Sequence, residues 1–273
     1  MTPHQDLIAF IGGGNMASAL LGGLIKAGVD AARLRVVEPL PAQREALAQR
    51  FGLQALAQAD ATLAQAGLVV WAVKPQAFGA AAAACAGHVE RALHLSVMAG
   101  IPSLAITRAS GSHRVVRSMP NTPALIGRGI AGLFATPGVT ADDRLRVEQM
   151  LAPTGQTLWL DRESDLDAVT ALSGSGPAYV FYFIEAMMQA AVQMGLSAEQ
   201  GRQLALATFD GATALAAGSP EAPHVLRERV TSKGGTTFAA LQSLQGDGVQ
   251  AAFVRALHAA RRRAQELGDE FGS

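Results

Sequence analysis

Short apolar runs alternate with alanine-rich, helix-like stretches along the first 160 residues of the chain. Five of the apolar runs are Leu7–Ile11, Leu34–Val37, Leu68–Val73, Leu93–Val97 and Val115–Met119. Several of them lack polar alternation, which is typical of strands that are buried on both faces of a sheet. The helix-like stretches between them are Met16–Ala27, Pro41–Phe51, Gln76–Ala86 and Pro102–Ala109. This strand–helix rhythm predicts a doubly wound, mainly parallel sheet that is covered by helices.

The pattern changes from strands to long helices near residue 165. Two later apolar runs, Ile130–Ala135 and Thr157–Leu160, are expected to extend the sheet, with a helix at Ala141–Leu151 between them. Beyond them the strand-like runs disappear. The helices predicted there are Ala178–Met194, Ala198–Ala217, Thr237–Gln245 and Val249–Leu267. The second half of the chain is therefore predicted to be all-helical.

The first of these helices points to a partner subunit. Ala178–Met194 carries one charged residue, Glu185, and is apolar on almost every side. A helix that is apolar all round is buried all round. A domain of about 110 residues has too little interior to cover it alone. We predict two domains, residues 1–163 and residues 164–273, and we expect the second to contact another subunit.

Composition agrees with a folded protein of two domains. Of the 273 residues, 49% are hydrophobic and 16% are charged, so a large core is available. The formal net charge is zero, so nothing global attracts a nucleic acid or an anionic membrane. The single cysteine, Cys85, excludes an intrachain disulfide. The uncharged stretch Leu7–Ile25 contains clustered glycines and Asn15, so we interpret it as strand, loop and helix and expect a cytoplasmic protein.

A glycine-rich loop follows the first predicted strand and opens the first predicted helix, reading G-x-G-x-x-A. Gly12 permits a tight turn, Gly14 lets the backbone approach a pyrophosphate, and Ala17 lets helix and strand pack closely. The helix N-terminus, at Asn15 and Met16, offers unpaired N–H groups and a partial positive charge to the anion. Because the loop lies in the first strand–helix–strand unit, it predicts a Rossmann-like dinucleotide-binding domain.

The second predicted strand ends at an acidic residue, Glu38. An acid at this position usually binds the adenosine ribose 2′-hydroxyl and repels a 2′-phosphate, which favours NADH. Three nearby arginines, Arg33, Arg35 and Arg44, are within reach of a phosphate, which favours NADPH. The sequence leaves the choice between NADPH and NADH open.

Two further segments follow predicted buried strands, at the edge of the sheet where ligands bind. Ala72-Val73-Lys74-Pro75 follows one strand, and Lys74 is placed to contact the cofactor ribose. Met119-Pro120-Asn121-Thr122-Pro123 follows another. Its two prolines restrain a polar loop whose Asn121 suits the orientation of a nicotinamide. Taken singly, each segment also fits an ordinary solvent lysine or a proline-bounded turn.

Two segments of small residues precede predicted helices in the second half of the chain. Ser173-Gly174-Ser175-Gly176-Pro177 places a proline in the first helical turn, so we interpret it as a loop with exposed N–H donors. Thr231-Ser232-Lys233-Gly234-Gly235-Thr236-Thr237 is a second candidate anion site. A small carboxylate is expected to bind its N–H groups and the hydroxyls of Ser232 and Thr237.

Missing residues exclude or disfavour other classes of protein. The chain has no His/Cys cluster with zinc-site spacing, no G-x-S-x-G and no G-K-[ST] phosphate loop. None of the six histidines lies in the polar glycine-rich loops, which disfavours a His-dependent hydroxy-acid dehydrogenase. Ala178–Met194 contains no lysine, which counts against a phosphogluconate-type dehydrogenase. A non-catalytic dinucleotide-binding protein is the remaining alternative, because fold alone does not establish activity.

Together these segments resemble pyrroline-5-carboxylate reductase along nearly the whole chain. Phe10–Ala19 is similar to the cofactor loop of that family, and Ala72–Pro75 and Met119–Pro123 match two further family blocks. The most specific blocks are Asp167–Tyr179 and Val230–Thr237. The resemblance implies reduction of 1-pyrroline-5-carboxylate to L-proline by NADPH or NADH. It also implies a helical domain that binds substrate and forms a homodimer, with dimers in many members assembled into a decamer.

The matched blocks assign site residues by position. The resemblance implies that the substrate is held by Ser232, Gly234, Gly235, Thr236 and Thr237, of which Ser232 and Thr237 are the expected catalytic residues. The residues expected to bind the cofactor are Gly12, Gly14, Asn15, Met16, Glu38, Ala72, Val73, Lys74, Pro75, Asn121, Ser175 and Gly176. No metal is expected.

The chain departs from the family at Lys233, where proline is usual. The loop thereby loses a restraint on φ and gains a cation beside the expected carboxylate site. The family has an acidic helper residue just upstream of this loop, and that residue maps near Glu221. In the implied reaction Thr237 is hydrogen-bonded to the ring nitrogen while hydride reaches the imine carbon. Positioning and cofactor chemistry then supply most of the catalysis.

Overall fold

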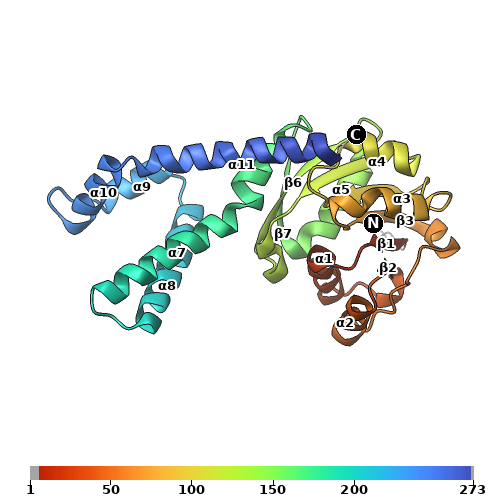
Figure 1. Ribbon diagram of the computed structural model, residues 1–273, viewed down its shortest axis with the longest axis horizontal. Helices are drawn as coiled ribbons and strands as arrows, with labels where there is room; N and C mark the ends of the chain where they lie inside the picture. The colour runs from red at the N-terminus through yellow and green to blue at the C-terminus, as the bar shows by residue number, and fades with distance from the viewer. Residues whose placement is uncertain (1–5, 272–273) are drawn as a thin grey trace. The chain divides into compact units, whose positions relative to one another are not determined.

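The computed structural model describes residues 6–271, and these form two compact units (Figure 1). The first unit runs as far as Ser175 and takes in the chain again from Ala260 onward. The second unit is Gly176–Ala259. No helix in the described part of the chain combines the length and the apolarity that a membrane span requires.

The first unit is built on a seven-stranded sheet. Its strands are β1 (Leu7–Ile11), β2 (Leu34–Val37), β3 (Ala66–Trp71), β4 (Leu93–Ser96), β5 (Val115–Met119), β6 (Gly129–Ala135) and β7 (Gly155–Trp159). Their order is β2-β1-β3-β4-β5-β6-β7. All neighbours are parallel except β5 and β6, which are antiparallel. The predicted doubly wound, mainly parallel sheet is confirmed, and both later apolar runs extend it.

Helices cover both faces of this sheet. One face is covered by α1 (Asn15–Lys26), α2 (Pro41–Phe51) and α5 (Ala141–Leu151), which share a hydrophobic core with β1 and β3. The other face is covered by α3 (Phe78–Cys85) and α4 (Ser103–Ser110), which share a second core with the same strands. Short 3-10 helices lie in the connections: η1 (Ala31–Arg33), η2 (Ala61–Gln65), η3 (Pro75–Ala77), η4 (Thr122–Ile126) and η5 (Ala152–Thr154).

A buried aromatic–histidine pair lies inside the second core. The Trp71 indole Nε1 donates a hydrogen bond to His94 Nδ1 at 2.9 Å, and His94 Nε2 lies 3.0 Å from the Val89 carbonyl oxygen. Because Nδ1 accepts, the proton must be on Nε2, and the ring is neutral. Burial lowers the pKa of His94 to about 4, against the opposing effect of the bond to Val89. We therefore interpret His94 as a structural residue of the core and not as a catalytic one.

The Glu163 carboxylate connects three segments of the first unit that lie far apart in the sequence. Glu163 accepts hydrogen bonds from the Ser103 backbone N–H and hydroxyl, both at 2.6 Å, and from Arg117 Nη1 at 2.9 Å. Burial by itself raises the pKa of Glu163, but the hydrogen bonds from Ser103 and Arg117 outweigh it and lower the pKa. Glu163 thus ties the start of α4 to β5 and to the segment after β7.

The segment Ser173–Pro177 is not the loop that the sequence predicted. It lies in a helical run formed by α6 (Asp165–Val169), the π-helix η6 (Thr170–Gly174) and the start of α7 (Gly176–Gln193). The Ser175 N–H donates to the Thr170 carbonyl at 2.8 Å, so this donor is not exposed as expected. The π-helical turn accommodates the small residues, which had suggested a loop between two helices. Wide turns of this type are frequent at functional sites.

The second unit is all-helical, as predicted. Its helices are α7, α8 (Ala198–Ala217), α9 (Pro223–Arg229), α10 (Thr236–Gly246) and the first part of α11 (Val249–Phe271). A Cβ atom on Gly201 would lie 2.8 Å from Ala191 Cβ, so a glycine is needed where α7 and α8 pack. The ring of Phe253 lies 5.7 Å from that of Tyr179 and 5.8 Å from that of Phe183. These contacts hold α7 against α8 and α11.

Candidate active site

The strand order of the first unit reverses at β1, which has β2 on one side and β3 on the other. Ligands of such sheets bind beyond the carboxyl ends of the strands at this reversal. Gly12 follows β1 with φ +99°, and a Cβ there would lie 2.7 Å from the Ala72 carbonyl oxygen, just after β3. A glycine is therefore required, and the tight turn expected at Gly12 is present.

Gly14 stands at the N-terminus of α1 with its α-carbon open to space. It is the N-cap residue of a 12-residue helix, and no side chain caps the N–H groups there. A Cβ on Gly14 would meet nothing within 4 Å. Asn15 and Met16 form the first turn, and Ala17 is fully buried against the core. Unpaired N–H groups beside an open space are the features that a phosphate group needs.

Glu38 holds the glycine-rich loop directly, which sequence reasoning missed. Its carboxylate accepts hydrogen bonds from the Gly13 N–H at 2.8 Å and the Leu40 N–H at 2.9 Å, and the residue is 7% exposed. The Gln43 side chain donates to the Gly13 carbonyl at 2.5 Å, which fixes the next peptide of the loop as well. Arg44 donates to the carbonyl oxygen of Glu38. One carboxylate oxygen of Glu38 is thus bonded to the glycine-rich loop and the other to the backbone that follows β2, whereas the sequence predicted a bond to the adenosine ribose.

Lys74 and its neighbours lie at the same sheet edge. The Ala72 N–H donates to the Ile11 carbonyl at 2.8 Å, which fixes the start of this segment beside β1. Val73 packs beside Gly12. Lys74 is exposed and is the N-cap residue of η3, and Pro75 is the first residue of that helix. The ammonium group is free to contact a ligand at this edge.

Asn121 links two segments that are distant in sequence. Its Nδ2 donates to the Ser173 hydroxyl at 3.1 Å, and its Oδ1 accepts from the Ile130 N–H at 3.0 Å. The amide therefore ties the end of β5 to the π-helical turn and to β6. Ser175 follows that turn, so the structure brings it into the same unit as the glycine-rich loop, whereas Gly176 begins the second unit.

The predicted substrate loop precedes α10 in the second unit. Gly234 has φ +76°, and the Gly235 N–H donates to the Ser232 carbonyl at 3.0 Å, which closes a tight turn. A Cβ on Gly235 would lie 2.7 Å from the Ser232 hydroxyl oxygen, so a side chain there would displace this hydroxyl. Gly235 caps α10, and no side chain satisfies the N–H groups of its first turn.

The hydroxyl groups of this loop are available to a ligand. Ser232 and Thr237 are exposed, and neither hydroxyl makes a hydrogen bond within residues 6–271. Lys233 is exposed and forms no ion pair within the same range. Glu221, by contrast, accepts a hydrogen bond from Arg229 at 2.5 Å. Free hydroxyls, free N–H groups and an adjacent cation suit a small carboxylate.

The expected residues are therefore collected into two groups. The residues expected to bind the cofactor lie in the first unit, Gly176 excepted, and the residues expected to bind the substrate lie in the second. Among the described residues, no group of histidine, cysteine and carboxylate side chains is arranged to hold a metal ion. The chemistry offered by the expected site residues is hydrogen bonding and positioning.

Known proteins match both halves of the chain. Residues 163–267 match the family described as pyrroline-5-carboxylate reductase dimerisation, and residues 7–100 match NADP oxidoreductase coenzyme F420-dependent. Pyrroline-5-carboxylate reductase of Pseudomonas aeruginosa is 44% identical over 97% of this chain and 98% of its own. The solved pyrroline-5-carboxylate reductase of Coxiella burnetii has a TM-score of 0.89 at 34% identity, covering 97% of this chain and 99% of its own. A Plasmodium falciparum pyrroline carboxylate reductase with NADP bound has a TM-score of 0.86 at 28% identity, covering 97% and 98%.

Proposed function

The chain belongs to the pyrroline-5-carboxylate reductase family, and from that premise we propose how its residues carry out the reaction of the family. The protein is an NAD(P)H-dependent oxidoreductase that reduces the C=N bond of 1-pyrroline-5-carboxylate to give L-proline. When bound, the reduced nicotinamide supplies a hydride to the imine carbon. The protein must bind both reactants, orient them and stabilise charge on the ring nitrogen.

The glycine-rich loop and its neighbours hold the cofactor in this proposal. The open space at Gly14 and the unpaired N–H groups of α1 fit a pyrophosphate. Glu38 fixes the Gly13 peptide, so it shapes the loop as well as bordering the adenosine ribose. Asn121, through its bonds to Ser173 and Ile130, keeps the end of β5 in place for the nicotinamide. Lys74 adds a cation at the same edge.

The loop before α10 holds the substrate. Its free N–H groups and the Ser232 hydroxyl bind the carboxylate, and Lys233 adds positive charge nearby. The Thr237 hydroxyl is assigned to the ring nitrogen, where it stabilises the charge that changes as the C=N bond is reduced. The free state of both hydroxyls supports this assignment. The hydroxyl donates to the lone pair of the neutral imine nitrogen, on which negative charge develops as hydride reaches the carbon, and a proton passed on from solvent completes the amine.

The chain assembles with itself and acts on a small molecule. For its assembly we propose a homodimer formed through the second unit, with dimers associated into a decamer as the family resemblance implies. The support is the apolar surface of α7, where Phe181 is 58% exposed and Tyr182 is 69% exposed. A cytoplasmic location is also our proposal, in keeping with a biosynthetic step.

The observation that carries the function is the loop at Ser232–Thr237, with free hydroxyls at the start of an uncapped helix. A dinucleotide-binding protein without catalysis would not need it. The test is a steady-state assay of the purified protein with pyrroline-5-carboxylate and, separately, NADPH and NADH. We expect turnover with at least one cofactor and formation of proline. Cofactor binding without turnover would leave only the non-catalytic alternative.

A further inference from the structure

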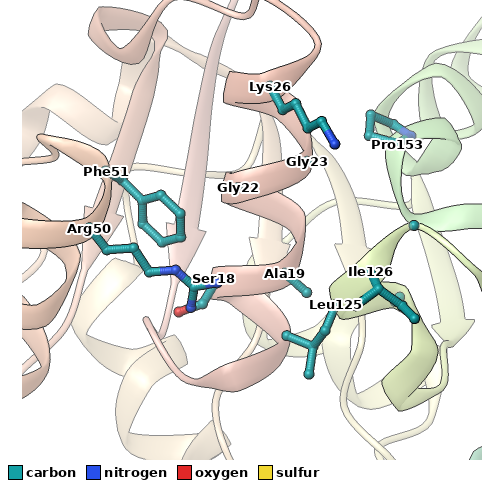
Figure 2. Close-up of a pocket in the computed structure, with 12 residues that line it drawn as sticks. Ser18, Ala19, Gly22, Gly23, Lys26, Arg50, Phe51, Leu125, Ile126 and Pro153 are labelled. Atoms are coloured by element: carbon teal, nitrogen blue, oxygen red, sulfur yellow. The ribbon is translucent and has the colours of Figure 1, made fainter.

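A hollow of about 290 Å³ lies along one side of α1, apart from the sheet edge described above (Figure 2). Its floor is formed by small residues of the helix, namely Ser18, Ala19, Gly22 and Gly23. Phe51 at the end of α2 forms one wall. Leu125–Ile126 of η4 and Pro153 of η5 form the other wall.

Two glycines of α1 let Phe51 and Pro153 approach the helix closely. A Cβ on Gly22 would lie 3.1 Å from the Phe51 ring, and a Cβ on Gly23 would lie 2.9 Å from the Pro153 side chain. Glycine inside a helix is destabilising relative to alanine, so two in succession need a structural reason. The close neighbours supply that reason. The two glycines thus add no side chain to the space between the walls.

Two cations without counter-charges border the hollow. Lys26 lies in the last turn of α1 and Arg50 in the last turn of α2, where each complements a helix C-terminus. In Figure 2 the Lys26 side chain points toward Pro153, whereas the Arg50 side chain extends toward Ser18. No lining residue is acidic, and neither cation forms an ion pair within the part of the chain that the structure describes.

Apolar side chains at the rim complete the surface. Leu125 is 49% exposed and Ile126 is 75% exposed, although both belong to a short helix next to the hollow. The Arg50 guanidinium carbon lies 4.9 Å from the centre of the Phe51 ring, so charge and aromatic surface adjoin. A ligand for this surface needs negative charge and apolar area together.

We propose that this hollow is a second ligand site, for a small organic anion distinct from the cofactor. Its charged oxygens would bind Lys26 and Arg50, and its apolar body would contact Phe51 and the exposed rim of η4. The volume is just below the usual range for small-molecule sites, about 300–1,000 Å³, and is too small for a dinucleotide. The hollow is lined from Ser18 onward, one helical turn beyond Gly14, and none of its lining residues belongs to the glycine-rich loop.

The test is calorimetric titration of phenyl phosphate into the full-length protein, with NADPH present at saturation to occupy the dinucleotide site. We expect saturable binding of one phenyl phosphate per chain. Inorganic phosphate should bind at least about 10-fold more weakly, because it lacks the apolar body. The double variant Lys26→Ala/Arg50→Ala should weaken phenyl phosphate binding by about 10-fold or more, since each lost hydrogen bond to a charged group costs roughly that factor.

Two matched variants keep the test specific. Lys26→Arg/Arg50→Lys retains both charges and should bind phenyl phosphate to within about 3-fold of the unaltered protein, given the limited geometric demand of an exposed ion pair. Arg108→Ala removes an exposed cation of α4, outside the hollow, and should leave binding unchanged. The NADPH affinity of every variant is measured in parallel. Failure of NADPH to bind would count against the proposed function and not against the second site.

The proposal is overturned if phenyl phosphate shows no saturable binding to the unaltered protein. It is also overturned if Lys26→Ala/Arg50→Ala binds as tightly as the unaltered protein, or if Arg108→Ala weakens binding equally. Equal affinity for inorganic phosphate and phenyl phosphate would contradict the apolar half of the site.

Discussion

The two units of this chain bury their apolar residues to different extents. The first unit has two hydrophobic cores, one on each face of its sheet, and residues such as Phe10 and Trp71 are fully buried. In the second unit, only Ala191, Gly201 and Ala205 are buried among the described residues. Its large apolar side chains remain exposed: Val180, Phe181, Tyr182, Phe183, Met187, Val192, Met194, Leu196, Leu204, Leu206, Leu215, Val230, Leu244, Phe253 and Val254.

One chain is therefore enough to bury the apolar residues of the first unit, whereas those of the second unit need an assembly to cover them. The first unit contains every residue expected to bind the cofactor except Gly176, and its core holds the glycine-rich loop in place. The substrate loop, in contrast, belongs to a unit that has little interior of its own. Surface of this extent and apolarity marks a protein interface. Substrate binding should therefore depend on assembly, whereas cofactor binding should depend on it much less.

Disruption of the α7 surface should produce the largest effect. In Phe181→Asp/Tyr182→Asp, two large side chains of the proposed interface are replaced by charges. Each lost burial costs about 1.5–3 kcal/mol, so the dimer dissociation constant should rise roughly 100-fold or more. Sedimentation at micromolar concentration should show monomer, with activity largely lost and NADPH still bound. Gln54→Asp, at an exposed position of the first unit, is the control. A dimeric, active double variant would refute the contrast between the units.

The cofactor site of the first unit should be sensitive to one added side chain. Gly14→Val places that side chain in the open space at the start of α1. Overpacking against a bound pyrophosphate costs about 1–3 kcal/mol, so NADPH affinity should fall by up to roughly 100-fold. Gly79→Val is the matched control, because a Cβ on Gly79 also meets nothing within 4 Å. Fluorescence titration measures affinity, and circular dichroism should show that both variants fold. Equal NADPH affinity in the two variants would show that Gly14 does not border the pyrophosphate.

The buried histidine should make the stability of the first unit depend on pH. The unfolded chain takes up a proton at His94 near pH 6.5, but burial lowers the pKa of the folded histidine to about 4. The unfolded state therefore binds more protons between these values, and acid favours unfolding. The free energy of unfolding should fall by about 3 kcal/mol as pH falls from 6.5 to 4, at about 1.4 kcal/mol per pKa unit.

Denaturant unfolding monitored by tryptophan fluorescence measures this stability, because Trp71 and Trp159 both lie in the first unit. In His94→Gln, the side-chain oxygen is able to accept from Trp71 and the amide to donate to Val89, without titrating. This variant should lose most of the pH dependence in that range. If the free energy of unfolding depends on pH as steeply in His94→Gln as in the unaltered protein, His94 is not the source of that dependence.

Kinetics should separate the two hydroxyls of the substrate loop. Thr237→Ala should lower kcat by roughly 10- to 100-fold with little change in substrate affinity, because a hydrogen bond to a charged group contributes about 1.5–3 kcal/mol. Ser232→Ala should raise KM and leave kcat nearly unchanged, because in the proposed function Ser232 holds the carboxylate in both ground and transition states. Both are measured at saturating cofactor. Unaltered kcat and kcat/KM in Thr237→Ala would show that this hydroxyl does not contact the ring nitrogen.

The sequence predicted the sheet more closely than the site. The ends of β1, β2 and β5 agree with the apolar runs, since strands buried on both faces leave a continuous apolar signal. The loop expected at Ser173–Pro177 is helical instead, because a π-helical turn accommodates residues that usually end a helix. Side-chain contacts between distant segments left no local signal. The bonds from Gly13 to Glu38 are one example.

Two other features were missed for similar reasons. The bond from Ser103 to Glu163 joins residues 60 positions apart, and neither residue type predicts the other. The short helix α9 (Pro223–Arg229) has too few turns to show an apolar period. In this chain, strands and helices with a regular pattern of buried residues were predictable from the sequence. The side chains that hold the loops in place could be identified only from the structure.

The most direct test of imine reduction follows the transferred hydrogen. The purified protein is supplied with pyrroline-5-carboxylate and with NADPH that carries deuterium at both C4 positions, and the product is analysed by mass spectrometry. The account predicts proline with one deuterium at C5, formed in step with cofactor oxidation. Oxidation of the cofactor without labelled proline, or no proline at all, would contradict it.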